Sequence, residues 1–422
     1  MPTGEMEATA ARTGPVSSRY LSFVGATGLS SVGDAAWTIA LASTVVESAG
    51  PATAGTVLAL AGVPRIVALL GAGAVADRHG AARVMVWSDL ARCVLMAVAA
   101  VAVAVTGPSV PVLFAVAAAL GLLGAFFLPA SGALRPLLLP PEHLVRGNAL
   151  YLIGLRTGQA AGGPVGAWLL GLGGMVVVAA VNAVSFLLSA VAVAFCRPRR
   201  EGKAAEPPGD TQDAHEAQDR TRLITRVVEG MRYAAGHRDL RLLLCVVGLV
   251  ELAGAGPVNV GLVLLADSLG AGAAGAGVLL SAFTVGAAAA FLTSLALPVR
   301  RRVTAVLVAC LAGQALVLVL LGHVHAVALA AVGYGLMGAV TAQASLVLMS
   351  LIQRSSTREM RGRVMALMSL LSFTAPLAGN VVMGVAVGSF GFAVTLGLHG
   401  VVAAASIAVF LNSRTLRGAR LD

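Results

Sequence analysis

Residues 174–196 read GMVVVAAVNAVSFLLSAVAVAFC, a stretch of 23 residues without one charged side chain. An α-helix rises about 1.5 Å per residue, so this stretch is long enough to cross the roughly 30 Å of hydrocarbon in a lipid bilayer. The segment therefore predicts a membrane-spanning helix.

The composition of the whole chain agrees with a membrane protein. Of its 422 residues, 58% are hydrophobic and 11% are charged, and the mean hydropathy is +0.90. A water-soluble protein of this length needs about a quarter of its residues charged to cover its surface. The four cysteines lie singly in or beside apolar segments, with neither metal-ligand spacing nor an extracellular pairing pattern. We expect no metal site and no cofactor.

Comparable apolar segments recur twelve times along the chain. They lie near residues 20–46, 54–76, 84–106, 111–134, 148–171, 174–196, 241–266, 275–298, 303–322, 326–352, 364–388 and 391–412. The predicted fold is an all-α membrane protein with twelve transmembrane helices.

The basic residues predict the orientation. Of the 29 Lys and Arg residues, 26 fall in the two tails and in alternate loops, while Arg65, Arg92 and Arg156 lie inside spans. Basic loops stay in the cytoplasm, so we expect both termini there. The net charge of +10 is therefore a signal of topology and not of a nucleic-acid partner. Residues 1–19 lack a small-residue cleavage site, which favours an uncleaved first span.

The chain contains an internal repeat. Residues 121–131 (GLLGAFFLPAS) and 335–345 (GLMGAVTAQAS) share six identities, and an Arg-Gly pair follows each, at 146–147 and 361–362. The offset of 214 residues agrees with the distance from the first span to the seventh, which predicts two pseudo-symmetric six-helix bundles. The expected organisation is a cytoplasmic tail (1–19), a first bundle (20–196), a linker (197–240), a second bundle (241–412) and a tail (413–422).

The linker has two parts. Residues 197–219 are rich in Pro, Glu, Asp and Ala, which predicts disorder. An apolar stripe follows on one helical face, opposite charged residues, which predicts a helix on the inner membrane surface; a merely solvated helix is the alternative. The stripe consists of Leu223, Ile224, Val227, Val228 and Met231.

A loop motif then suggests a family. Residues 73–80 read GAVADRHG and lie between the second and third spans. The residues that form the motif are a first glycine, an Asp-Arg pair and a second glycine: Gly73, Asp77, Arg78 and Gly80. This resembles the loop signature of the major facilitator superfamily, whose expected role is to lock one conformational state. The sequence departs from the pattern at Ala81 and Ala82, where basic residues are usual.

Within that superfamily the chain resembles the macrolide-efflux branch of drug:proton antiporters. The similar stretches are Gly33-Asp34, Val63-Pro64, Asp89 with Arg92, EGMRY at 229–233, and RGRVMAL at 361–367, which contains Arg361, Gly362 and Arg363. Gly163-Pro164 in the fifth span resembles the antiporter motif, although Gln159 stands where that motif has glycine. A proline kink with small-residue packing is the alternative for this motif.

Four ionisable residues are expected at similar depth in the membrane. Counted at 1.5 Å per residue from the cytoplasmic ends, Asp34 lies about 20 Å up, Arg65 about 18 Å, and Arg156 and Glu251 about 15 Å. Each costs roughly 2.5–3.5 kcal/mol unless it is paired or hydrated. We therefore expect the four to face an internal cavity and to pair.

Two of these groups are candidate proton carriers, Asp34 first and Glu251 second. A moving Arg65 or Arg156 would switch the protonation of a carboxyl beside it. The alternative is a static ion pair that fixes helix packing.

Weaker candidates for the cavity are Trp37, Tyr334 and Gln343, each of which also has a structural explanation as a hydrogen-bonding partner between helices. Asp89 and Arg92 are one turn apart and are predicted to pair near the loop of Asp77.

The predicted function is secondary active export of small hydrophobic or amphipathic compounds by proton antiport, in a bacterial cytoplasmic membrane and as a monomer. No GxxxxGK[ST] loop for a nucleotide occurs, and no enzymatic activity is expected. An uptake symporter or facilitator, and a non-transporting sensor or assembly protein, are the alternatives.

Overall fold

The computed structural model describes residues 17–140, 143–196, 229–296, 303–357 and 360–417, and every regular element in them is helical. The helices are α1 (Ser18–His79), α2 (Ala81–Thr106), α3 (Val110–Leu138), α4 (Leu144–Phe195), α6 (Arg238–Gly256), the π-helical η2 (Pro257–Gly261), α7 (Leu262–Ser268), α8 (Gly272–Ala296), α9 (Val303–Leu321), α10 (Val327–Ser355), α11 (Arg361–Phe390), α12 (Phe392–Leu411) and the short α13 (Arg414–Arg417). A further short helix covers residues 229–236.

The twelve predicted spans are confirmed. In the described residues, ten helices are long and apolar enough to cross a membrane, and two of them, within α1 and α4, are about twice as long as a crossing requires. Each of these two folds back at glycine: Gly50 has φ 81°, and Gly174 has φ 64°. Glycine adopts such positive φ values without the steric cost of a Cβ. Each long helix is therefore two spans joined by a tight turn.

The seventh span contains a π-helical turn, which was not predicted. It runs through α6, η2 and α7, and Pro257 is the first residue of that turn. Proline has no backbone N–H, so the carbonyl of Ala253 four residues earlier has no helical donor. Nδ1 of His399 on α12 lies 3.0 Å from that carbonyl oxygen and donates to it. The buried His399 thus satisfies the acceptor that Pro257 leaves free.

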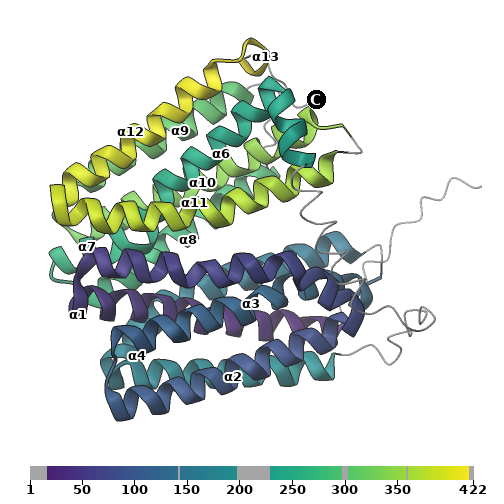
Figure 1. The fold of residues 1–422 in the computed structure, drawn as a ribbon, viewed down its shortest axis with the longest axis vertical. Coiled ribbons are helices and arrows are strands. Elements are labelled where there is room, and N and C mark those ends of the chain that lie inside the picture. Colours follow the sequence, from purple (N-terminus) through teal and green to yellow (C-terminus); the bar gives the residue numbers. More distant parts are fainter. Residues whose placement is uncertain (1–16, 141–142, 197–228, 297–302, 358–359, 418–422) are drawn as a thin grey trace, which may run out of the picture.

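The helices form two groups, α1–α4 and α6–α12, which lie side by side in Figure 1. They meet mainly where α1 packs against α11 and where α4 packs against α8. The first glycines of the 121–131 and 335–345 repeat occupy corresponding places in the two groups. A Cβ at Gly121 would lie 3.0 Å from the carbonyl oxygen of Ala61 in the second span, and one at its counterpart Gly335 would lie 3.5 Å from that of Ala282 in the eighth.

The apolar core differs between the two ends of the molecule. At the end that carries the turns at Gly50, Gly174 and Gly391, called here the Gly50 end, one continuous cluster contains residues of both groups, including Val46 and Leu265. At the opposite end, called the Gly80 end, each group has a cluster of its own. The two groups are therefore joined at the Gly50 end and have separate cores at the Gly80 end.

The bounds predicted for the tails and the linker remain predictions, because residues 1–16, 197–228 and 418–422 lie outside the described part. The predicted surface stripe falls mostly there. Its last residue, Met231, belongs to the 229–236 helix and is exposed, while Ala234 of the same helix is buried in the core of the second group.

Close helix contacts make certain glycines necessary. A Cβ at Gly286 on α8 would overlap the carbonyl oxygen of Gly335 on α10. We expect Gly286→Ala to cost about 1–3 kcal/mol of stability by overpacking. Thermal unfolding of the purified protein in detergent measures this. Gly248→Ala is the control, since no atom lies within 4 Å of a Cβ there. Equal melting temperatures for the two variants would contradict the packing described.

Candidate functional site

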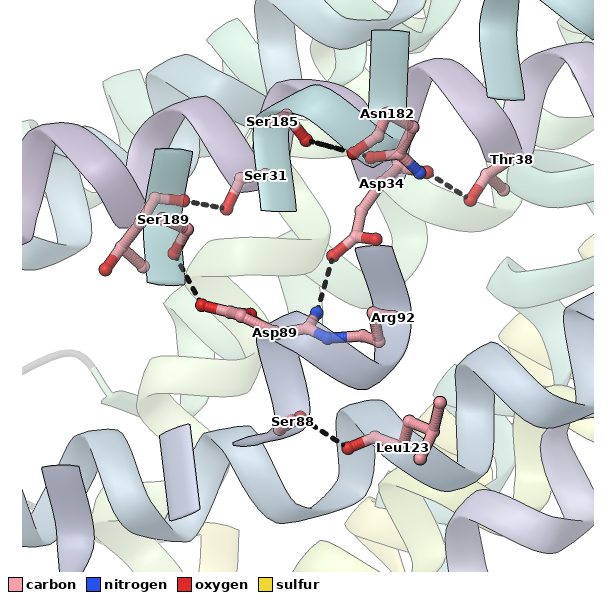
Figure 2. Close-up of polar contacts among 11 residues, drawn as sticks. Ser31, Asp34, Thr38, Ser88, Asp89, Arg92, Leu123, Asn182, Ser185 and Ser189 are labelled. Carbon is pink, nitrogen blue, oxygen red and sulfur yellow. Dashed lines mark hydrogen bonds and ion pairs between the residues drawn. The ribbon is translucent and has the colours of Figure 1, made fainter. Parts of the chain in front are cut away.

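A buried guanidinium lies between two carboxylates in the first group of helices. Arg92 and Asp89 are one turn apart on α2 and form an ion pair, and Nη1 of Arg92 also lies 3.6 Å from Oδ2 of Asp34 on α1. The hydroxyl of Ser189 on α4 donates to the second oxygen of Asp89 at 2.7 Å. Figure 2 shows the resulting chain from α4 through α2 to α1.

Arg92 is held from several sides. Its guanidinium lies 4.8 Å from the ring centre of Phe127 and 4.4 Å from that of Phe186, within the range of cation–π attraction. Its side chain is 5% exposed and that of Asp89 is 0% exposed. A charge this far from water is tolerated only with a partner of opposite sign. Asp89 is that partner, and the two rings and Ser189 fix the geometry.

Asp34 has a different environment from Asp89. It lies in the middle of its span, is enclosed by protein atoms, and has 51% of its side chain accessible. This combination is expected of a group that borders an internal, water-accessible space. Asp34 is therefore the more accessible carboxylate of the two.

The residue before Asp34 sets its position. A Cβ at Gly33 would overlap Oδ1 of Asn182 on α4, so a larger residue here would displace the Asn182 side chain. Ser185 donates to the same Asn182 oxygen at 3.0 Å, as Figure 2 shows. The Gly33-Asp34 motif thus combines a close helix contact with an accessible carboxylate.

Among the described residues, no ion pair joins any two of the four groups that were predicted to pair with one another. Arg65 acts electrostatically on Asp34, yet no ion pair joins these two described residues, and the guanidinium that contacts Asp34 is that of Arg92. Arg156 donates to Gln159 at 3.0 Å, and Glu251 interacts with the hydroxyl of Ser372. The expectation that Arg156 and Glu251 pair with the other two was wrong, because each finds a neutral partner nearby.

Instead, both arginines reach the other group of helices. The guanidinium carbon of Arg65 lies 5.4 Å from the ring centre of Phe373 on α11, and that of Arg156 lies 5.7 Å from the ring centre of Phe291 on α8. A guanidinium at these distances is attracted to the ring face.

The weaker candidates are packed in the protein. Tyr334 is fully buried and donates to the carbonyl of Pro257 at 2.9 Å, and Trp37 is 4% exposed. Gln343 accepts from Ser294 at 2.6 Å, which joins α10 to α8. Tyr334 and Trp37 therefore do not border open space in this conformation, and Tyr334 contacts the π-helical turn of the seventh span.

Residues 73–79 of the predicted loop motif belong to α1, and the chain turns at Gly80, which has φ 85° and separates α1 from α2. Gly73 lies within α1 and has no neighbour that a Cβ would meet. Arg78 makes contacts of its own, whereas the side chain of Asp77 lies outside the described part. Ala82, which stands where the superfamily signature usually has a basic residue, is fully buried.

Two motifs that are far apart in sequence meet. Glu229, the first residue of EGMRY, forms an ion pair of 3.0 Å with Arg363 of RGRVMAL. Gly230 approaches the backbone of Arg363 so closely that a Cβ would lie 2.9 Å from its carbonyl oxygen. Nε of Arg361 donates to the carbonyl of Gln353 at 3.1 Å, and a Cβ at Gly362 would meet no described neighbour.

Gly163 and Pro164 lie at the contact between the groups. A Cβ at Gly163 would lie 2.6 Å from the carbonyl oxygen of Gly277 on α8, and one at Gly277 would lie 2.8 Å from the nitrogen of Pro164. The motif therefore brings the backbones of α4 and α8 together.

Sequence reasoning missed the surroundings of Arg92. Phe127, Phe186 and Ser189 come from α3 and α4, and no spacing in the sequence relates them to α2.

In the described residues no cluster of His, Cys, Asp and Glu is arranged to hold a metal ion. The arrangement offers one accessible carboxylate beside a fixed positive charge, which suits proton binding and release.

Comparisons with known proteins agree with this fold. The model of the Major Facilitator Superfamily matches residues 23–250. The multidrug efflux pump Tap of Mycolicibacterium fortuitum is 30% identical over 219 residues, which cover 50% of this chain and 50% of Tap. The match thus spans about half the length of that relative.

Solved transporters share the fold at low sequence identity. The nucleoside transporter NupG superposes with a TM-score of 0.71 at 14% identity, over 93% of this chain and 99% of that one. A bacterial homologue of the iron transporter ferroportin, in an inward-facing state, gives 0.70 at 16% identity, over 93% and 98%. The family model covers more than half of the chain, and twelve spans in two groups surround its buried charges. The chain therefore belongs to the major facilitator superfamily of membrane transporters.

Proposed function

We propose that this transporter exports small hydrophobic or amphipathic compounds, drugs or natural products, in exchange for protons. The observation that carries the proposal is Asp34, a half-exposed carboxylate in mid-span beside the buried Arg92. The similarity to the multidrug efflux pump Tap supports export of drugs. Uptake by symport is the second candidate, since the nucleoside transporter NupG has the same fold.

In this proposal Asp34 takes up and releases the proton. When Asp34 is ionised, Arg92 stabilises its charge; when it is protonated, Arg92 keeps Asp89 as its partner. The buried Arg92 is thus compensated in both states. Asp89 and Ser189 hold the guanidinium in place, while Asp34 alone alternates.

The arrangement of the apolar clusters, joined at the Gly50 end and separate at the Gly80 end, suggests which step of the transport cycle this conformation represents. The basic loops lie at the Gly80 end, and we place that end in the cytoplasm of a bacterium, with both termini. The joined Gly50 end then faces outward, and the conformation is inward-facing. A compound would enter from the cytoplasm or inner leaflet and leave after the two groups of helices rock.

The driving force is sufficient. One proton crossing 100 mV releases about 2.3 kcal/mol, and a difference of one pH unit adds about 1.4 kcal/mol. Together these support a concentration ratio of several hundred for a neutral compound exchanged one for one, since each 1.4 kcal/mol is about tenfold.

The first test uses inverted vesicles that contain the protein and a pH-sensitive dye. After acidification of the lumen by respiration, we expect ethidium or erythromycin to release protons with the wild type and not with Asp34→Asn. Asn keeps the shape of the side chain and cannot carry the proton. Equal release by Asp34→Asn would remove Asp34 from the mechanism. Proton flow in the opposite sense would favour symport, and no response to any compound in a wider panel would favour a non-transporting protein.

A second test concerns Arg92 as a fixed charge. Arg92→Leu leaves Asp89 buried without a partner, which costs about 3–5 kcal/mol. We expect a large fall in the melting temperature in detergent. Adding Asp89→Asn should restore most of the stability, because the unpaired charge is then gone. If the double variant is as unstable as Arg92→Leu, the two side chains do not compensate each other.

A third test concerns orientation. Single cysteines at Gly107 and at Ser18 are placed in a variant without the four native cysteines, and intact cells are treated with a membrane-impermeant maleimide. We expect labelling at residue 107 and not at residue 18, because residue 18 lies at the end that carries the basic loops. The reverse pattern would place the termini outside.

A further inference from the structure

Two buried side chains in the second group of helices each have a hydrogen-bonding atom that no protein atom satisfies. His399 on α12 is 3% exposed, and Gln314 on α9 is 0% exposed. No described protein atom forms a hydrogen bond with Nε2 of His399 or with Oε1 of Gln314. Such atoms are rare in protein interiors, because burial removes their hydrogen bonds to water without a replacement.

The remaining bonds of the two side chains show that both atoms are acceptors. Nδ1 of His399 lies 3.0 Å from the carbonyl oxygen of Ala253, and Nε2 of Gln314 lies 3.3 Å from that of Val250. A carbonyl can only accept, so Nδ1 carries the hydrogen of a neutral imidazole and Nε2 is left as an acceptor. The amide oxygen of Gln314 is an acceptor as well. Neither atom can therefore satisfy the other.

The spacing along α6 suits a bridge between the two side chains. Val250 and Ala253 are three residues apart on α6, a rise of about 4.5 Å. A Cβ at Gly254 would lie 3.2 Å from the amide nitrogen of Gln314, which places this amide beside the same face. One molecule that donates two hydrogen bonds of about 2.8 Å at a tetrahedral angle spans a similar distance, about 4.6 Å.

The contact between α9 and α12 brings the two side chains together from the other side. A Cβ at Gly400 would lie 3.0 Å from the carbonyl oxygen of Ala315. Gly400 follows His399 and Ala315 follows Gln314, so the backbones of α9 and α12 touch at the positions next to both side chains. The two acceptors thus lie in one region enclosed by α6, α9 and α12.

We propose that a single water molecule binds between His399 and Gln314 and donates one hydrogen to Nε2 and the other to Oε1. Water has the two donor hydrogens that the pair lacks, and it carries no charge into the apolar interior. The bound water links α9 to α12 beside the stretch of α6 where Pro257 removes a helical hydrogen bond. This site is independent of proton exchange at Asp34 and of the direction of transport.

A proton on Nε2 is the other way to join the two acceptors, because an imidazolium would itself donate to Oε1. It would bury a positive charge where, among the described residues, no carboxylate forms an ion pair with His399. An unpaired buried charge is far less favourable than a buried water with two polar partners. The neutral imidazole with a bound water is therefore favoured.

The experiment is solid-state NMR of the full-length protein in lipid bilayers at neutral pH. His399 is the one histidine of the chain that follows a leucine, Leu398, so labelling the leucine carbonyls and the histidines assigns it without a mutation. We expect a directly bonded hydrogen at Nδ1, none at Nε2, and magnetisation transfer from water hydrogens to Nε2. A hydrogen bonded directly to Nε2 would overturn the water site in favour of a proton or the other tautomer. Absence of transfer from water would also overturn it.

The matched variants are Gln314→Met and Gln343→Met. Each replaces an amide inside a span by an apolar side chain of similar length, but the oxygen of Gln343 already accepts from Ser294. Because Gln314→Met removes one of the two acceptors that hold the water, we expect the transfer to Nε2 of His399 to fall several-fold. It should stay unchanged in Gln343→Met. Equal transfer in the wild type and in Gln314→Met would overturn the shared site.

Discussion

Arg92 carries its charge where little water reaches it, and the cost of that burial, several kcal/mol per ion, constrains the residues around it. Asp89 must stay beside it, two aromatic rings must cover its faces, and Ser189 must orient Asp89. Once these contacts are made, Arg92 is a fixed positive charge. Asp34 lies beside Arg92 and is positioned by the close approach of Gly33 to α4. Of Arg92, Asp89 and Asp34, it is the group whose charge changes at least cost.

The parts of the fold that follow from local chemistry were predictable. Span lengths follow from hydropathy, and turns such as Gly50 and Gly174 interrupt long helices where apolar segments adjoin. The i, i+3 spacing of Asp89 and Arg92 likewise predicts their contact. What depends on neighbours distant in sequence was not predictable. The rings over Arg92 come from α3 and α4, and depth alone did not reveal that Arg156 turns toward Phe291.

The seventh span shows how a proline inside a membrane helix is compensated by tertiary contacts. Pro257 frees the carbonyl of Ala253; His399 on α12 donates to that carbonyl, and Tyr334 on α10 donates to the carbonyl of Pro257. Gln314 donates to Val250 one turn earlier at 3.3 Å. The sequence shows a proline in an apolar run, but its buried polar partners appear there only as isolated residues. These donors therefore hold the backbone on both sides of Glu251.

The two interfaces between the groups of helices have a common construction, with backbone-to-backbone contact near the Gly50 end and an Arg–Phe pair at mid-depth. Small residues make contacts that are short in range, so a slight separation of the helices loses them together. A cation–π pair is longer in range and directional, and a flexible arginine can exchange a ring for a carboxylate. Of the two arginines, Arg65 is the one that acts electrostatically on Asp34, so two interfaces of similar construction differ in the charge that they bring to the accessible carboxylate beside Arg92.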